Sequence, residues 1–368
     1  MPDSAPGATS PSPGAVPGAT TTSRGTAPGA TMAAEIAQQP ETLARLLRDG
    51  TAAIDSVARA VAARSPRFVL LAARGTSDHA ALYLKYLIEV RLGLPVGLVS
   101  PSTLTVYAAR PRYDDVLWIA LSQSGGSPDL VESTTRAREA GAWTIAITNA
   151  PESPLATAAD AHIDVMAGPE LAVAATKSYT SELLAAWLLA ESWAGGDTSR
   201  AEVLPALARD VLDRGYGLEV APRYRFVERL VTTGRGFAYP TAREAALKLM
   251  ETSYLSAHAF SSADLMHGPL AMIDEDRPVI AVVPFGAGGA AMQPVLDRLA
   301  ERGADVLVEG DVERAPRAAA AIPLPETGED LAPILQIMPL QQLAYAMAIA
   351  RGYDPDAPRG LRKVTETL

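Results

Sequence analysis

Three charged side chains recur on one face of a helix predicted within residues 241–260. Glu244, Lys248 and Glu251 are spaced i, i+4 and i+7, which brings them within about 40° of one another around the helix axis. A glycine-rich turn precedes this helix, and His267 follows it. Carboxylate, amine and imidazole together offer general acid–base chemistry on a sugar. The alternative is a solvated helix face with an i,i+4 ion pair worth roughly a few tenths of a kcal/mol.

Two polar segments, RGTSD and SQSGGSPD, each follow a predicted buried strand. In open parallel sheets, ligands bind outside the carboxyl ends of the strands. Glycines let a backbone approach a ligand closely, and a helix N-terminus attracts anions. We therefore predict a phosphate site formed by these side chains: Thr76, Ser77, Ser122, Gln123, Ser124 and Ser127. Turns and helix caps alone would also use these residue types.

The phosphate predicted here belongs to a small molecule rather than to a nucleotide. Neither segment has a lysine at the P-loop position, and the chain contains neither GxGxxG nor GxxxxGK[ST]. The other three histidines, His79, His162 and His258, lack neighbours of this kind and are interpreted as structural or surface residues. No histidine has an HExxH-type partner, so we expect no metal and no cofactor.

Strand and helix patterns alternate along the chain. Predicted strands are 68–72, 96–99, 116–121, 143–148, 162–165, 227–233, 278–283 and 304–308. Predicted helices are 78–93, 128–140, 178–195, 241–260, 292–302 and 331–351. This alternation predicts an α/β fold of two doubly wound parallel-sheet domains.

The domain boundaries follow from composition and from the repeat of this pattern. Residues 1–31 are almost entirely Pro, Gly, Ala, Ser and Thr, and are predicted to be a disordered tail, with Met32 as a possible start of the folded protein. The predicted parts are a first domain at 32–201, a connector at 202–224, a second domain at 225–350 and a C-terminal tail at 351–368.

Composition limits the classes of function. The formal net charge of −10 argues against nucleic-acid binding, which needs a basic face. No stretch reaches the roughly 18 apolar residues of a membrane span, and the N-terminal segment lacks the apolar core of a signal peptide. There is no cysteine, which excludes disulfides and a thiol nucleophile within these residues. A cytoplasmic location is expected.

Taken together, the motifs resemble the SIS (sugar isomerase) family, specifically its two-domain sugar-phosphate enzymes. The matching segments cover nearly everything after residue 32: RGTSDHAA, SQSGGSPDL, AGPELAVAATKSYTSEL, REAALKLMETSYLSAHAFSSADLMHGPLAMID and PRGLRKVT. The resemblance implies two SIS domains with a C-terminal lid. It also implies a small-molecule sugar phosphate as the ligand.

The resemblance assigns roles residue by residue. The six polar side chains named above would hold the phosphate, and Val173 and Ala175 would line the sugar through their backbone. Glu251 would move a proton between C1 and C2, while Lys248 and Glu244 would orient the open-chain sugar. His267 would open the ring from the neighbouring subunit of a homodimer. Lys363 matches a lysine that forms a Schiff base with a ketose.

Two departures bear on the reaction. Amidotransferases of this family carry a glutaminase domain with a cysteine nucleophile, and their loop reads SQSGET where this chain has SQSGGSPD. The expected activity is therefore deamination of glucosamine 6-phosphate to fructose 6-phosphate and ammonia. The alternatives are a fructosamine-6-phosphate deglycase, an aminogalactose-phosphate ketose isomerase, an amidotransferase-like isomerase without glutaminase, and a non-catalytic sugar-phosphate sensor.

Overall fold

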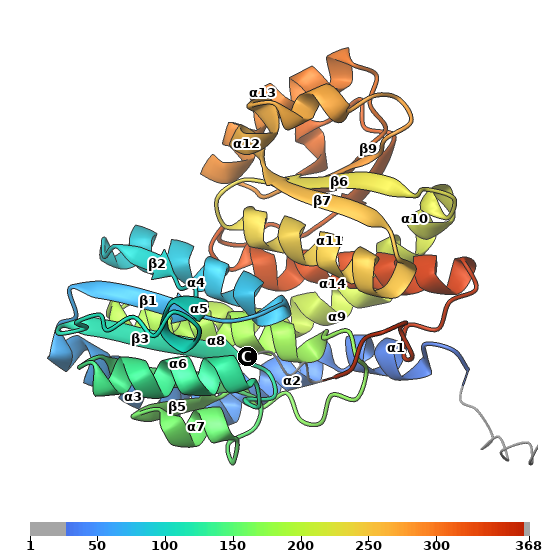
Figure 1. Cartoon of the computed structure of the whole chain (residues 1–368). Helices are drawn as coiled ribbons and strands as arrows, with labels where there is room; N and C mark the ends of the chain where they lie inside the picture. Colours follow the sequence, from blue (N-terminus) through green and yellow to red (C-terminus); the bar gives the residue numbers. More distant parts are fainter. Residues whose placement is uncertain (1–26, 364–368) are drawn as a thin grey trace, which may run out of the picture.

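The computed structural model describes residues 27–363 and contains two separate parallel sheets, each flanked by helices (Figure 1). In the first sheet the strand order is β2-β1-β3-β4-β5, and all pairs are parallel. Its strands are β1 (Phe68–Ala72), β2 (Val96–Leu98), β3 (Val116–Ser122), β4 (Trp143–Thr148) and β5 (Ala161–Asp164).

The second sheet repeats the winding of the first. Its order is β10-β9-β8-β6-β7, again all parallel. In each sheet, the strand order therefore reverses between the first and the third strand along the chain. Its strands are β6 (Arg229–Gly234), β7 (Ser256–Ser261), β8 (Val279–Val283), β9 (Val306–Gly310) and β10 (Ala320–Pro323). The predicted fold class, two doubly wound α/β domains, is confirmed.

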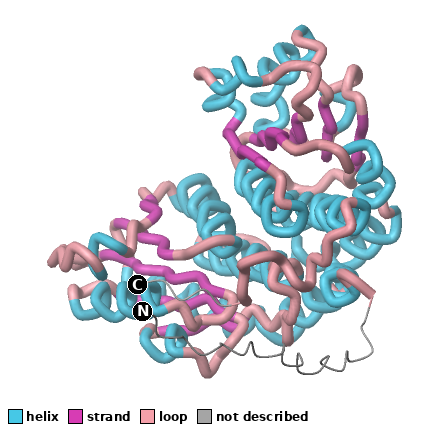
Figure 2. Tube along the Cα trace, turned by 45° about the vertical axis from the view of Figure 1, so that its right-hand side comes forward, coloured by secondary structure: helices cyan, strands magenta, loops and turns pink. Residues whose placement is uncertain are grey.

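Helices cover both sheets and fill the space between them (Figure 2). Those of the first half are α1 (Ala30–Ala37), α2 (Gln39–Arg45), α3 (Thr51–Arg64), α4 (Thr76–Leu92), α5 (Ser102–Thr105), α6 (Pro128–Glu139), α7 (Pro154–Ala158) and α8 (Lys177–Trp193). Those of the second half are α9 (Leu204–Arg214), α10 (Tyr216–Tyr224), α11 (Ala238–Ser253), α12 (Ser262–Met266), α13 (Ala287–Glu301) and α14 (Ala332–Ala350). Residues 202–224, predicted as a connector, therefore lie mainly in α9 and α10.

A single apolar core joins the two domains. Buried side chains of α8 and α4 are continuous with those of α11 and α14, for example Leu183, Leu84, Leu249 and Met347. Because protein interiors are close-packed, such a core fixes α4 of the first domain against α11 of the second. That contact decides which side chains meet across the domain boundary.

The helix predicted over residues 241–260 is too long at its C-terminal end. α11 ends at Ser253, where Tyr254 adopts a left-handed conformation with φ 55°, and β7 follows as an edge strand. The small residues in SAHAF allowed the helical pattern to be extended, but the left-handed residue breaks it. Strand β10 was not predicted at all, since AAIP is short and carries little β-branched character.

The described residues begin before the predicted start of the folded part. Residues 27–31 fall within the tail predicted at 1–31, yet Gly29 N donates to Asp354 Oδ1 at 2.9 Å and Thr31 N to Asp356 Oδ2 at 2.8 Å. The C-terminal segment thus binds the N-terminus of α1 (Figure 1). Residues 1–26 and 364–368 lie outside the described part of the chain.

Candidate functional site

A cavity of about 330 Å³ lies at the carboxyl edge of the first sheet. Of the residues predicted for the site, those that line it are Thr76, Ser77, Ser122, Gln123, Ser124, Ser127, Val173, Ala175, Glu251 and Lys363. Arg74, Arg362 and Leu361 line it as well. The volume suits a small phosphorylated ligand.

The two polar segments meet here because β1 and β3 are neighbours at the point where the strand order reverses. α4 and α6 both begin at this edge, and neither N-terminus is capped by a side chain. Ser122 Oγ accepts from Gly125 N at 3.2 Å and Ser124 Oγ from Gly126 N at 3.3 Å, so these serines also shape the turn. Two uncapped helix N-termini facing one cavity favour an anion.

Arg74 adds a positive charge that the sequence analysis did not identify. Its guanidinium binds Asp129 Oδ2, with Nε at 2.9 Å and Nη2 at 2.8 Å. Asp129 is buried in the first turn of α6, where its charge would repel a bound phosphate. Arg74 compensates this charge at the wall of the cavity.

The turn between β3 and α6 requires glycine at position 125. Gly125 has φ 60°, and a Cβ there would lie 2.1 Å from Ser153 Oγ. We expect Gly125→Ala to weaken binding of a monophosphate ester at least about tenfold, since the turn must move. The control is Gly195→Ala, where φ is 68° but nothing lies within 4 Å. Calorimetric titration of both variants measures the affinity for the monophosphate ester. Equal losses of affinity would show that the contact with Ser153 is not the cause.

A buried polar network links α4 and α11 behind the cavity. His79 Nδ1 lies 2.7 Å from Glu244 Oε2, and Thr76 Oγ1 donates to Glu244 Oε1 at 3.0 Å. Lys248 Nζ donates to Thr76 Oγ1 at 3.0 Å and to Glu251 Oε2 at 2.6 Å, and lies 3.2 Å from Glu244 Oε1. One ammonium group therefore ties the phosphate turn at Thr76 to the carboxylate of Glu251.

The charges in this network hold one another in place. Burial alone would lower the pKa of Lys248, but the carboxylates of Glu244 and Glu251 outweigh it and raise that pKa. Burial alone would raise the pKa of Glu244, yet Lys248 and His79 keep it below its usual value. Lys248 is thus a permanent cation near neutral pH. It cannot act as a base, and its function is to position Glu251 and Thr76.

Three predicted catalytic residues lie outside the cavity. Lys248 and Glu244 are fully buried and do not line it. They contact Thr76 and Glu251, which do line it, and the expectation that they orient the sugar stays a prediction. His267 is exposed on the second domain, after α12, and does not line this chain's cavity. His79 was interpreted as structural or surface, but it is a buried member of the network.

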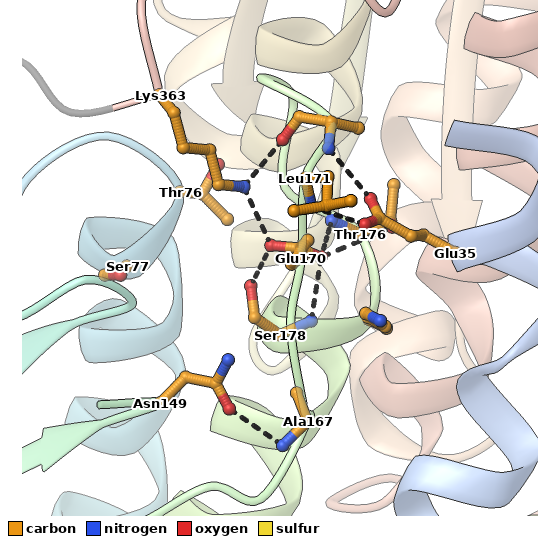
Figure 3. Close-up of polar contacts among 12 residues, drawn as sticks. Glu35, Thr76, Ser77, Asn149, Ala167, Glu170, Leu171, Thr176, Ser178 and Lys363 are labelled. Atoms are coloured by element: carbon orange, nitrogen blue, oxygen red, sulfur yellow. Dashed lines mark hydrogen bonds and ion pairs between the residues drawn. The ribbon is translucent and has the colours of Figure 1, made fainter. Parts of the chain in front are cut away.

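Residues 361–363 of the C-terminal segment line the cavity, and Lys363 contacts the loop before α8 (Figure 3). Lys363 Nζ donates to Ala172 O at 2.6 Å and to Glu170 Oε2 at 3.2 Å. Glu170 also accepts from Thr176 N at 2.9 Å and from Ser178 N at 3.1 Å. Burial alone would raise the pKa of Glu170, but Lys363 and Ser178 lower it. Glu170 therefore binds both the N-terminus of α8 and the lysine of the tail.

At the corresponding edge of the second sheet, a side chain of the protein itself binds the N-terminus of a helix. There the carboxylate of Glu329 accepts from Ala287 N at 2.9 Å and from Gly288 N at 2.8 Å, at the N-terminus of α13. The chain's own side chain thus takes the place that an anion would occupy. The two sheets therefore differ at this edge: Glu329 occupies the N-terminus of α13, whereas the N-termini of α4 and α6 have no side-chain cap.

Within residues 27–363, no group of three or more His, Asp or Glu side chains is arranged to hold a metal ion. No helix in this range has the length and apolar character to span a membrane.

The fold and the site define a two-domain α/β protein that presents an anion site beside a carboxylate. The chain belongs to the SIS domain family, which matches residues 64–192 and 225–351. It is 37% identical over 344 residues to the glutamine–fructose-6-phosphate aminotransferase (isomerizing) of Pyrobaculum aerophilum, covering 90% of this chain and 56% of that protein. The chain thus spans about half the length of the curated relatives it matches.

Solved structures of the same architecture exist. One from Silicibacter pomeroyi, provisionally described as a phosphosugar isomerase, is 37% identical with a TM-score of 0.79 and covers 88% of this chain and 99% of its own. Glucosamine-6-phosphate deaminase from Thermotoga maritima has the same fold at 23% identity, with a TM-score of 0.76 and coverage of 92% and 100%. This chain is a member of the sugar-phosphate isomerase family.

Proposed function

We propose that the protein deaminates glucosamine 6-phosphate, giving fructose 6-phosphate and ammonia. The observation that carries the proposal is the position of Glu251. It is the only carboxylate lining the cavity among the described residues, and the hydroxyl-rich turns and Lys363 line the same cavity. A phosphate held by the turns leaves the other end of the sugar free to react near a single acid–base group.

The reaction divides into isomerisation and hydrolysis. In the open-chain amino aldose, Glu251 removes the proton from C2 and returns it to C1, while the amine nitrogen loses a proton and O1 gains one. This converts the C1 aldehyde into an alcohol and the C2 amine into an imine. Water then adds to C2, and the carbon–nitrogen bond breaks to leave fructose 6-phosphate and ammonia. No oxidant or reductant is consumed.

The tail would limit the access of water to this intermediate. Lys363 lines the cavity and donates to Glu170 and Ala172, so we expect its amine to lie near the reacting end of a bound sugar. Deamination is favoured over transfer of nitrogen from glutamine because the loop after β3 reads SQSGGSPD, where amidotransferases of this family have SQSGET. The Thermotoga maritima protein shows that the same fold is used by a glucosamine-6-phosphate deaminase.

We propose a homodimer in which His267 opens the sugar ring in the partner's site. This proposal is motivated by the exposed position of His267 on the second domain, outside this chain's own cavity. An imidazole that supplies a proton to the ring oxygen has to come within hydrogen-bond reach of the substrate. A second copy of the chain would have to provide it.

The direct test is turnover of glucosamine 6-phosphate by the purified protein. We expect ammonium and fructose 6-phosphate to appear in equal amounts, and fructose 6-phosphate with ammonium to run the reaction in reverse. Fructosamine 6-phosphate, galactosamine 6-phosphate and N-acetylglucosamine 6-phosphate are compared by kcat/KM in the same assay. Preference for one of these would replace the substrate assignment, and binding without any product would favour a sensor.

A further inference from the structure

A second carboxyl group lies behind the phosphate turn, outside the cavity. Glu182 is on α8 and is 1% exposed. Its Oε1 lies 2.9 Å from Ser77 Oγ, and its Oε2 has no hydrogen-bond partner among the described residues. Ser77 lines the cavity, whereas Glu182 does not. Among these residues, the only polar contact of Glu182 is therefore with Ser77, which is predicted to bind the phosphate.

The surroundings of Glu182 oppose a negative charge on it. Glu170 in the loop before α8 and Glu244 on α11 are both buried carboxyl groups nearby, and Tyr179 on α8 has a buried hydroxyl with no partner among the described residues. The positive charge of Lys363 acts in the opposite direction and favours the ionised form of Glu182. Burial, assisted by Glu170 and Glu244 and opposed by Ser77 and Lys363, raises the pKa of Glu182 to about 8. Near neutral pH the group is mainly a neutral acid.

The protonation of Glu182 decides where the hydrogen of Ser77 points. A carboxylate can only accept, so ionised Glu182 takes the hydrogen of Ser77 and leaves only lone pairs toward the cavity. A neutral carboxylic acid can donate to Ser77 Oγ, which frees the hydroxyl hydrogen of Ser77 for another acceptor. A phosphate offers only acceptors when it is dianionic, so it binds well in the second case and poorly in the first.

We propose that Glu182 is a positioning residue for the substrate phosphate: as a neutral acid it donates to Ser77 Oγ and orients the Ser77 hydroxyl as a donor into the cavity. The inference rests on the proposed function, because it requires a phosphorylated sugar at this turn. Glu182 does not touch the substrate and acts only through Ser77. A carboxylate at this depth would also repel the phosphate directly.

The proposal predicts that the affinity for a sugar phosphate falls as the pH rises above neutral. The second ionisation of a phosphate ester lies near pH 6, so the ligand carries a constant charge above about pH 7.5. As pH rises through about 8, Glu182 loses its proton, Ser77 turns its hydrogen away from the ligand, and the dissociation constant rises. A variant at position 182 separates the contribution of Glu182 from that of every other group at the cavity.

The test is calorimetric binding of fructose 6-phosphate from about pH 7 to about pH 9.5. We expect the wild-type dissociation constant to rise about thirtyfold over this range, as ionisation of one group predicts when only the neutral form binds. Glu182→Gln, whose amide can donate to Ser77 Oγ without titrating, should bind like wild type at about pH 7 and lose less than about twofold. Ser77→Ala should bind weakly at all pH values with a much shallower slope.

The outcomes separate the two proposals. A Glu182→Gln protein with the same alkaline slope as wild type, or a wild type with no slope, would overturn the role of Glu182 while leaving the sugar-phosphate site intact. Absence of fructose 6-phosphate binding to wild type at every pH would overturn the proposed function itself. Thermal unfolding of each variant shows whether it is folded, and Ser77→Ala gives a second route to the same answer if Glu182→Gln does not fold.

Discussion

Replacing Glu251 by glutamine is expected to lower kcat for glucosamine 6-phosphate about a thousandfold, in the range typical of a lost general acid–base group. Glutamine has the size of glutamate, and its carbonyl oxygen can still accept from Lys248, which now lies 2.6 Å from Glu251 Oε2. The fold and the binding of the substrate should therefore persist. The measurement is steady-state turnover, together with incorporation of deuterium at C1 of fructose 6-phosphate in heavy water.

Hydrogen exchange distinguishes proton transfer from a structural defect. A variant that binds fructose 6-phosphate with wild-type affinity but exchanges no hydrogen at C1 has lost the acid–base group alone. The matched control is Glu301→Gln, an exposed glutamate on α13 far from the cavity in sequence and in the fold. Full activity in Glu251→Gln would end the assignment of the proton transfer to this residue.

The same variant tests whether sites are shared between subunits. If His267 acts in the partner's site, a mixed dimer of Glu251→Gln and His267→Ala contains one complete site and one doubly defective site. Random reassociation of equal amounts should then restore about a quarter of wild-type activity. Two inactive proteins that stay inactive after mixing, with exchange of subunits verified, would argue that each chain works alone.

The side chains that line the cavity were largely predictable because parallel strands end at a common edge. Thr76 and Ser122 follow different strands, and the sheet order puts β1 beside β3, so their turns converge without any further information. The register of α11 likewise gave Glu251, since i+3 and i+4 spacings define a helix face. What the spacing could not tell is that this face is buried against α4 rather than solvated.

The residues that were missed act across the domain boundary or behind the first layer. His79 lies one turn after Thr76 on α4, and only the packing of α4 on α11 reveals its contact with Glu244. Glu182 lies on α8, where nearly every side chain is buried, polar ones included. A carboxyl group buried in such a helix is itself a signal that it has a specific partner or is neutral. The role of Arg74 in neutralising Asp129 becomes visible only in the structure, where Asp129 is buried beside it.

Removing the amine of Lys248 is expected to destabilise the protein more than removing any exposed cation. Lys248→Met leaves Glu244, which is fully buried, with only His79 and Thr76 as partners. Breaking a buried ion pair by deleting one partner costs about 3–5 kcal/mol of the free energy of unfolding, because an uncompensated charge stays in the interior. Denaturant unfolding followed by circular dichroism measures the difference.

The matched control is an ion pair of similar geometry on the surface. Arg298 and Glu301 on α13 are also spaced i,i+3 and lie 2.5 Å apart, but their side chains are 54% and 56% exposed. Arg298→Met should lower the free energy of unfolding by less than about 1 kcal/mol, since water screens exposed pairs. If both substitutions had the same small effect, the network on α11 would carry no more energy than a surface pair.

The pH dependence gives a further check on the cause. Lys248 keeps the pKa of Glu244 below its usual value, so the stability that this pairing contributes is present above the unfolded pKa of a glutamate and is lost as pH falls through the folded pKa. The gap between Lys248→Met and wild type should therefore be largest near neutral pH and shrink in acid. Adding Glu244→Gln to Lys248→Met removes the uncompensated charge and should recover part of the stability. Activity should stay low in the double variant, because Thr76 and Glu251 would still lack the ammonium group that now binds them both.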